Sequence, residues 1–213
     1  GHGFESRGWL PPDARPVRRP GSMPSPRHPE PAVARLSIIY DTHEGQTRCV
    51  AEAIADVARE QGHDATLHDD HEPPGPADLA AADLIIVGGS VHRGRHDPRL
   101  TEFVIRNRDV LQTTPSAFFS VSLSAAGRSD DQQADALRLL EDFLRDTDWT
   151  PDRTRTVAGA LRYRRYGILT RYLMKWIAGR AGGDTDTSRD HEYTNWDDVR
   201  AFTLECLDLL PEP

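Results

Sequence analysis

Five short apolar runs alternate with amphipathic stretches along most of this 213-residue chain. Parallel strands need crossover connections, usually helices, and strands that are buried on both faces are apolar throughout. The expected strands are residues 36–40, 65–69, 83–90, 116–122 and 154–161. The alternation therefore predicts an α/β fold with a doubly wound, five-stranded parallel sheet in the order 2-1-3-4-5 and helices on both faces.

The segments between these strands have the periodicity and the end signals of helices. Val50, Ile54 and Val57 recur at spacings of four and three residues, which places them on one helix face. Pro98 stands in the first turn of an amphipathic segment, where its missing N–H costs least. The expected helices are residues 46–62, 98–111, 130–146 and 195–210.

The N-terminal stretch has a different composition. Residues 1–33 contain eight of the 16 prolines, mixed with arginine and glycine, and have no hydrophobic period. Such a composition buries too little apolar surface to offset the entropy lost on ordering. We therefore expect a disordered extension over residues 1–33 and one folded domain over residues 34–213.

Charge and hydropathy exclude several classes of protein. The formal net charge of −8 argues against nucleic acid as the main partner. No apolar run approaches the roughly 20 residues that a membrane-spanning helix needs, and none resembles the apolar core of a signal peptide. Cys49 and Cys206 stand in expected helices without a metal-binding spacing, so we expect two buried, reduced thiols. We expect a cytoplasmic protein, with contact to one face of a membrane left open.

The first strand runs into a loop of small and hydroxylated residues, in the sequence LSIIYDTHEGQT over residues 36–47. In a doubly wound sheet, ligands bind outside the carboxyl ends of the strands, beside the first strand. Gly45 allows a tight turn, Thr42 and Thr47 offer hydroxyls, and the next helix offers free N–H groups. The loop lacks the lysine and the spacing of a triphosphate site. It predicts a site for a monophosphate, with an ordinary helix cap as the alternative.

Two further strand ends are rich in small residues: GGSVHRG at residues 88–94 and SVSLSAAG at residues 120–127. Exposed backbone at these places suits the edges and faces of a flat ring. The side chains expected nearest such a ring are Val91, His92, Arg93 and Leu123. The alternatives are a surface-loop histidine at position 92 and close backbone packing at Gly88 and Gly89.

A 33-residue insertion, residues 162–194, separates the last strand from the last helix. It contains six basic residues and no acid before Asp184: Arg162, Arg164, Arg165, Arg171, Lys175 and Arg180. An apolar face with aromatics recurs at helical spacing: Leu169, Tyr172, Leu173, Trp176 and Ile177. We expect a basic amphipathic helix, which can pack on the core of the protein or lie in a lipid interface.

No metal site is indicated. His68 and His71 would not converge at a strand end, and Asp184 and Asp186 are not followed by a calcium-binding loop. The sequence contains no recognisable arrangement of a catalytic nucleophile with its base.

The three strand-end loops, in this order, resemble those of the flavodoxin-like fold, whose first loop holds the FMN phosphate and whose second and third loops hold the isoalloxazine. Thr42, Gly45 and Thr47 match the T-x-x-G-x-T pattern, whereas His43 and Glu44 depart from the hydroxyl-rich pair of short flavodoxins. The resemblance implies FMN as cofactor. The implied binding residues are Thr42, His43, Glu44, Gly45, Gln46, Thr47, Ser90, Val91, His92, Arg93, Gly94, Ser122 and Leu123.

Four longer segments resemble the bacterial menaquinone-dependent protoporphyrinogen IX dehydrogenases. They are EGQT at 44–47, PSAFFSVSL at 115–123, WTPDRTRTVAGALRYRRY at 149–166 and GGDTDTSRDHEYTNWDDV at 182–199. This resemblance implies oxidation of protoporphyrinogen IX to protoporphyrin IX in haem biosynthesis, with menaquinone or a related membrane quinone as electron acceptor.

The resemblance also suggests a role for the insertion. Its cations would meet the propionates of the porphyrinogen or anionic lipid headgroups on the inner face of the cell membrane. The residues concerned are Arg162, Arg164, Arg165, Arg171 and Trp176. No catalytic base is assigned, although His92 is a candidate by location, and homo-oligomerisation is left open.

Two alternative functions are kept. One is a flavodoxin-like electron carrier or an FMN-dependent quinone reductase that does not act on porphyrinogens. The other is an interaction protein that has kept the fold and lost the flavin.

Overall fold

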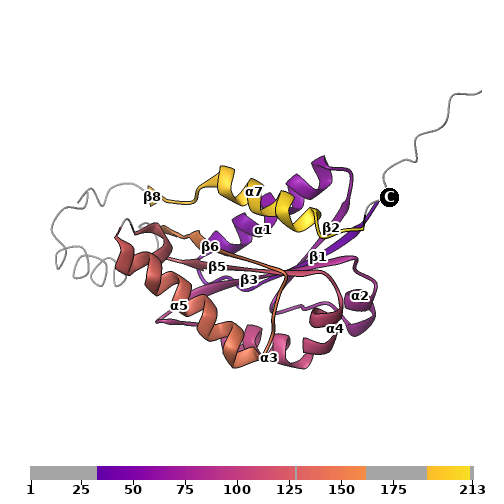
Figure 1. Ribbon diagram of the computed structural model, residues 1–213, viewed down its shortest axis with the longest axis horizontal. Coiled ribbons are helices and arrows are strands. Elements are labelled where there is room, and N and C mark those ends of the chain that lie inside the picture. Colours follow the sequence, from indigo (N-terminus) through magenta and orange to yellow (C-terminus); the bar gives the residue numbers. More distant parts are fainter. Residues whose placement is uncertain (1–32, 128, 162–190, 212–213) are drawn as a thin grey trace, which may run out of the picture. The chain divides into compact units, whose positions relative to one another are not determined.

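The computed structural model describes residues 33–127, 129–161 and 191–211 (Figure 1). The extension expected over residues 1–33 lies outside these residues, apart from Val33. The expected amphipathic helix of the insertion also lies outside them, together with Arg162, Arg164, Arg165, Arg171 and Trp176.

The described residues form eight strands and six α-helices. The strands are β1 (Arg35–Tyr40), β2 (Asp64–Asp69), β3 (Leu84–His92), β4 (Arg95–His96), β5 (Ser116–Ser122), β6 (Arg153–Ala158), β7 (Ala160–Leu161) and β8 (His191–Glu192). The helices are α1 (Gln46–Glu60), α2 (Pro76–Ala80), α3 (Pro98–Arg106), α4 (Arg108–Thr113), α5 (Asp130–Thr147) and α7 (Trp196–Leu207), and a 3₁₀ turn, η1, covers Ser124–Ala126.

The main sheet has the predicted topology. Its order is β2-β1-β3-β5-β6, and all four pairings along this path are parallel. Because β4 is a two-residue strand that only pairs antiparallel with the end of β3, this order is the predicted 2-1-3-4-5. Parallel pairing brings the carboxyl ends of β1, β3 and β5 to one edge of the sheet.

The central strands are apolar because each of their faces is buried. Ile38 and Phe119 belong to the core beneath α1 and α7, on the face that carries these two helices in Figure 1. Ile39 and Phe118 belong to the core on the other face, under α3, α4 and α5. Neighbouring residues of one strand therefore alternate between two cores, as the period of two in a strand requires.

Several boundaries differ from the predicted ones for identifiable reasons. The helix expected over 98–111 is divided at Asn107 (φ −108°, ψ 12°). The Asn107 side chain donates a 2.8 Å hydrogen bond to the Phe103 carbonyl and so competes with the helical pattern. The strand expected over 154–161 leaves the main sheet after Ala158, and Ala160 and Leu161 pair with β8 instead.

Two further expectations concern the state of the cysteines and whether any helix could span a membrane. The two cysteines are thiols, not a disulfide; Cys206 is buried as expected, whereas Cys49 is half-buried. Among the residues that the structure describes, no helix combines the length and the apolar character needed to cross a bilayer.

Candidate functional site

A cleft of about 600 Å³ lies at the carboxyl ends of β1, β3 and β5. It is lined by Thr42, His43, Glu44, Gln46, Thr47, Ser90, Val91, His92, Arg93, Val121, Ser122, Leu123 and Gly159. Every residue expected to bind the cofactor lines this cleft except Gly45 and Gly94. Val121 and Gly159 are lining residues that the sequence did not indicate.

The loop after β1 presents an uncapped helix end to the cleft. Gly45 adopts a left-handed conformation (φ 86°) at the N-cap position of α1, where a glycine has no side chain to cap the helix. The Thr42 hydroxyl accepts a 2.9 Å hydrogen bond from the Gly45 N–H, so it closes the loop and does not cap α1. The N-cap position therefore lacks the side-chain oxygen of an ordinary cap, and the N-terminus of α1 suits an anion.

Thr47 carries a buried hydroxyl that has no partner among the described residues. Its side chain lines the cleft from the first turn of α1, and the residue is only 1% exposed. Its Oγ1 makes no hydrogen bond to any described group. Leaving a buried hydroxyl unsatisfied costs about 1–3 kcal/mol, so this atom indicates a polar ligand at the N-terminus of α1.

The second predicted loop is mostly strand. β3 continues to His92, and only Arg93 and Gly94 form the turn that leads into β4. Both have positive φ, 53° for Arg93 and 79° for Gly94, as a tight two-residue hairpin requires. A non-glycine residue in this region is uncommon, and such residues cluster at functional sites. The turn holds Arg93 at the mouth of the cleft.

The glycines of β3 serve close packing. A Cβ atom on Gly88 would overlap the ring of Phe119, and one on Gly89 would lie 2.7 Å from Cδ2 of His96. Phe119 is fully buried, and His96 donates to or accepts from Ser120 at 3.0 Å. Burial lowers the pKa of His96 to about 4. Gly88 and Gly89 therefore allow close packing against buried side chains, as the second alternative for these glycines predicted.

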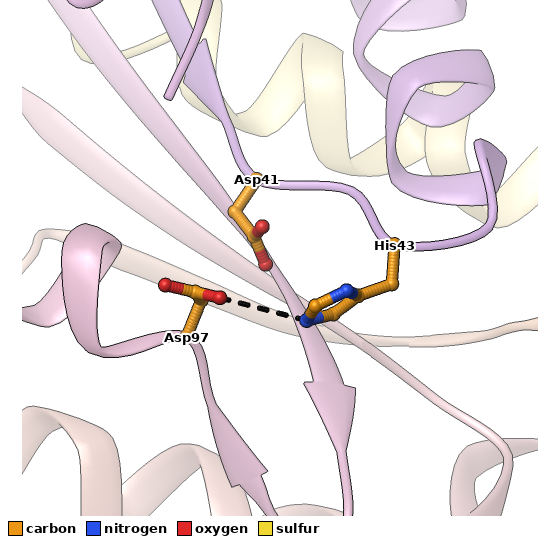
Figure 2. Close-up of side chains that lie close together, drawn as sticks. All are labelled: Asp41, His43 and Asp97. Carbon is orange, nitrogen blue, oxygen red and sulfur yellow. Dashed lines mark ion pairs between the residues drawn. The ribbon is translucent and has the colours of Figure 1, made fainter. Parts of the chain in front are cut away.

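Asp41, His43 and Asp97 form a polar cluster beside the cleft, with their side chains directed toward one another (Figure 2). His43 Nε2 lies 3.5 Å from Asp97 Oδ2. Asp41 is buried and accepts a 2.7 Å hydrogen bond from the Ser90 hydroxyl. Burial raises the pKa of Asp41, and the Ser90 hydrogen bond offsets part of that rise. The position of Asp97 directly before Pro98, as a helix cap, was the only sequence signal for it.

A second polar cluster, Asp69, Asp70 and His71, follows β2 outside the cleft. Burial is the main reason why the pKa of Asp70 is raised to about 6, and its hydrogen bond with Asp69 adds to the effect. Arg99 donates a 2.8 Å hydrogen bond to Nδ1 of His71. His68 is not part of this cluster, so the His-x-x-His spacing does not converge.

A hydrogen-bonded chain joins the first loop to the far side of the cleft. Gln46 donates a 2.8 Å hydrogen bond to the Thr194 hydroxyl, which donates in turn to the Ala158 carbonyl at 2.8 Å. Thr194 lies just after β8, where the chain returns from the insertion. Sequence reasoning did not find this residue, because 148 positions separate it from Gln46.

The family model described as a flavodoxin domain matches residues 37–188, which includes the cleft residues of β1, β3 and β5. The chain belongs to the flavodoxin domain family. This confirms the resemblance of the three strand-end loops and the predicted fold class.

Two relatives with names are similar to this chain over most of their length. The Protoporphyrinogen IX dehydrogenase [quinone] of Escherichia coli (strain K12) is 34% identical over 176 residues, which are 83% of this chain and 96% of that protein. The protein of the same name from Leishmania major is 30% identical over 168 residues, 79% of this chain and 72% of that protein. The chain shares a family with these dehydrogenases, as its four longer segments indicated.

Solved structures agree on the fold alone. Oxidised flavodoxin 1 from Bacillus cereus has a TM-score of 0.51 at 18% identity, over 84% of this chain and 100% of that one. The Streptococcus pneumoniae flavodoxin has a TM-score of 0.50 at 14% identity, over 82% of this chain and 99% of that one.

The raised pKa of Asp70 predicts a pH-dependent stability. Folding raises this pKa from 3.8 to about 6, so the stabilisation is fully present below about pH 4 and is lost as the pH rises through about 6. Asp70→Asn cannot ionise and should be more stable than the wild type near pH 7.5. The difference in unfolding free energy should grow by about 1–2 kcal/mol between about pH 4.5 and pH 7.5.

Urea unfolding at both pH values measures this difference. Asp64→Asn, which removes the exposed acid at the other end of β2, is the matched control for loss of one negative charge. An Asp70→Asn difference that is the same at both pH values would show that burial does not hold the proton on this carboxyl.

Proposed function

We propose that this protein oxidises protoporphyrinogen IX to protoporphyrin IX with bound FMN and a quinone acceptor, in haem biosynthesis. The observation that carries the proposal is the 34% identity with the E. coli dehydrogenase over 96% of its length. That range includes the strand-end loops that build the cleft. The protein is thus an FMN-dependent oxidoreductase of the flavodoxin fold.

The residues at the N-terminus of α1 fit the phosphate of FMN. Thr47 supplies the buried hydroxyl that lacks a partner among the described residues, and the uncapped amides of α1 supply further donors. No lysine is needed, because a helix N-terminus and neutral donors bind a phosphate well. We assign the loop from Thr42 to Thr47 to the phosphate and its ribityl chain, through its backbone N–H groups and the Thr47 hydroxyl.

The ends of β3 and β5 would border the isoalloxazine. Val91 and Leu123 offer apolar contacts on its two sides, while Ser90 to Gly94 offer backbone groups to its edge. Ser122 is already engaged, because its hydroxyl accepts a 3.1 Å hydrogen bond from the Ala125 N–H and so shapes the third loop. Bound FMN would supply the two-electron chemistry between a porphyrinogen carbon as hydride donor and the quinone as final electron acceptor.

Arg93 fits a carboxylate or a negative charge that develops in the cleft. It is the only arginine among the described lining residues, and the strained turn holds its backbone in place. Arginine pairs with carboxylates through two parallel hydrogen bonds. We assign it to a propionate of the substrate or to the flavin edge.

We propose that the quinone is menaquinone or a relative, reached by peripheral contact with the inner face of the cell membrane. The basic, aromatic composition of the insertion supports this assignment, because cations and tryptophan favour an anionic lipid interface. Arg162, Arg164 and Arg165 are assigned to the same surface or to the substrate propionates. The protein is then cytoplasmic and membrane-associated.

The activity is tested anaerobically with purified, FMN-loaded protein, protoporphyrinogen IX and a water-soluble menaquinone analogue. Porphyrin fluorescence should appear, and its yield beyond one equivalent of enzyme should require both FMN and the quinone. Tightly bound FMN without any porphyrin would refute the proposed substrate. It would favour an electron carrier or a quinone reductase, which reduction of the quinone by other donors would reveal.

Removing the Thr47 hydroxyl tests the assignment of the phosphate site. Thr47→Val should weaken FMN binding by about 10- to 100-fold, the worth of one hydrogen bond to a charged group. The FMN-free protein should keep or gain stability, because an unsatisfied buried hydroxyl is removed. Quenching of FMN fluorescence measures affinity, and thermal unfolding measures stability.

The matched control is Thr203→Val on α7. Thr203 is equally buried, but its hydroxyl already donates to the Val199 carbonyl at 2.8 Å. This variant should lose some stability and leave FMN affinity unchanged. Unaltered FMN affinity in Thr47→Val would place the phosphate elsewhere.

The membrane proposal is tested with two substitutions in the insertion, Arg171→Gln and Lys175→Gln together. Each basic residue near an anionic surface contributes about 1 kcal/mol, so flotation with vesicles that contain anionic lipid should weaken about 10- to 30-fold. Arg138→Gln with Arg145→Gln on α5 removes the same charge from an exposed helix and should float like the wild type. Equal flotation of both double variants would argue against this surface.

A further inference from the structure

The imidazole of His43 is placed between the cleft and two carboxylates that come from different elements (Figure 2). Asp41 directly follows β1, and Asp97 joins β4 to α3. The candidate ligand atoms of the three side chains all lie within 4.8 Å of one another. His43 itself lines the cleft, and its side chain is 43% exposed. The ring therefore meets the interior of the cleft on one side and the acids on the other.

Hydrogen bonds from neighbouring residues fix the orientation of both carboxylates. Asp97 Oδ1 accepts a 2.8 Å hydrogen bond from the Arg99 N–H and caps α3, which leaves Oδ2 for His43. Asp41 is 3% exposed, and its Oδ2 accepts hydrogen bonds from the hydroxyl and the N–H of Ser90. Side chains fixed in this way keep their geometry without help from a ligand.

This arrangement favours one tautomer of His43. A carboxylate that faces Nε2 favours the tautomer with its proton on that nitrogen, which leaves the lone pair on Nδ1. When Nδ1 takes up a proton, the positive charge forms next to Asp97 and Asp41, and the interaction with both is attractive. A histidine oriented by a carboxylate is the usual construction of a general base.

We propose that His43 is the proton acceptor of the porphyrinogen oxidation and that Asp97 is its positioning residue. The proposal rests on the proposed function and names a residue for a step that the sequence left unassigned. In the first two-electron step the substrate would lose a hydride from a bridging carbon to the oxidised flavin. An N–H bond of the substrate breaks, its proton forms a bond to His43, and the substrate gains a C=N bond. The proton then passes to solvent, and the quinone reoxidises the flavin.

His92, the candidate by location, is the weaker choice. Its ring centroid lies 4.8 Å from that of His43, so both histidines border the cleft. Among the described residues, however, no carboxylate lies at ion-pair distance from His92. The charged groups that face His43 are Asp41 from β1, Asp97 before α3 and the adjoining His92 of β3. Glu44 and Arg93 also line the cleft.

The test follows the bleaching of bound flavin when holoenzyme is mixed anaerobically with protoporphyrinogen IX in the absence of quinone, across about pH 5.5–8.5. The wild-type rate constant should rise with pH to a plateau, as the base loses its proton. His43→Gln should react about 100-fold more slowly or worse and should lose this dependence, which is the range of a lost general base.

Asp97→Asn separates positioning from folding. Asparagine keeps the hydrogen bond to the Arg99 N–H, because it caps helices as well as aspartate does. The variant should move the midpoint of the pH dependence to lower pH and slow the plateau rate by about 10-fold. Nitrogen-15 NMR of the imidazoles in the holoenzyme should show the same displacement for His43, independently of turnover.

His71→Gln is the matched control. His71 Nε2 lies 3.8 Å from Asp70 in a similar pair outside the cleft, so its loss should change neither the rate nor its pH dependence. All variants are compared at saturating FMN, so that a change of FMN affinity in His43→Gln does not enter the measured rate.

The outcomes distinguish a failure of the proposed function from a failure of the role proposed for His43. A wild-type flavin that is not bleached by the porphyrinogen overturns the proposed function and this inference with it. A bleached wild type with an equally fast His43→Gln variant, or with an unchanged pH dependence in that variant, overturns the inference alone. An unchanged NMR titration of His43 in Asp97→Asn removes Asp97 as the positioning residue.

Discussion

Burial of the central strands on both faces is the constraint on which the rest of this structure depends. β1, β3 and β5 can lie side by side in parallel only if helices cover each face, and their residues alternate between two separate cores. The same parallel direction puts three strand ends at one edge. Because backbone groups at those ends cannot pair within the sheet, that edge is the natural place for a ligand.

Burial of the central strands on both faces explains which features of the fold could be predicted from the sequence. A strand buried on both faces appears as a continuous apolar run, so the strands and their order could be predicted from the pattern alone. Thr42, Gly45 and Thr47 were predictable because a single loop holds all three. Asp97 was not, because its contact with His43 depends on where β3 turns and where α3 begins. The exit of the chain from the main sheet after Ala158 likewise depends on its partner β8, which is distant in sequence.

The polar edge of the sheet concentrates acids in a chain that is already negative. Asp41 is buried, and the side chain of Asp70 is only 7% exposed. Burial raises the pKa of both, and the charge of Asp41 raises the pKa of Asp70 further. Burial disfavours the charged form of such carboxyls, so they keep their protons to higher pH than exposed carboxyls do. An edge that combines them with His43 and His92 is suited to chemistry in which protons and electrons leave a substrate together. A simple electron carrier has less use for it.

The pairing of β7 with β8 affects how the fold can accommodate an inserted segment. Ala160 pairs with Glu192 and Leu161 pairs with His191, so the two positions that flank residues 162–190 lie side by side. The cost of closing a loop grows only with the logarithm of its length, about 0.6 kcal/mol for each doubling. A segment between two such adjoining ends can lengthen, shorten or be exchanged by recombination while the sheet and the cleft stay unchanged. The two short strands therefore mark a position at which a flavodoxin domain can tolerate an inserted segment of variable length.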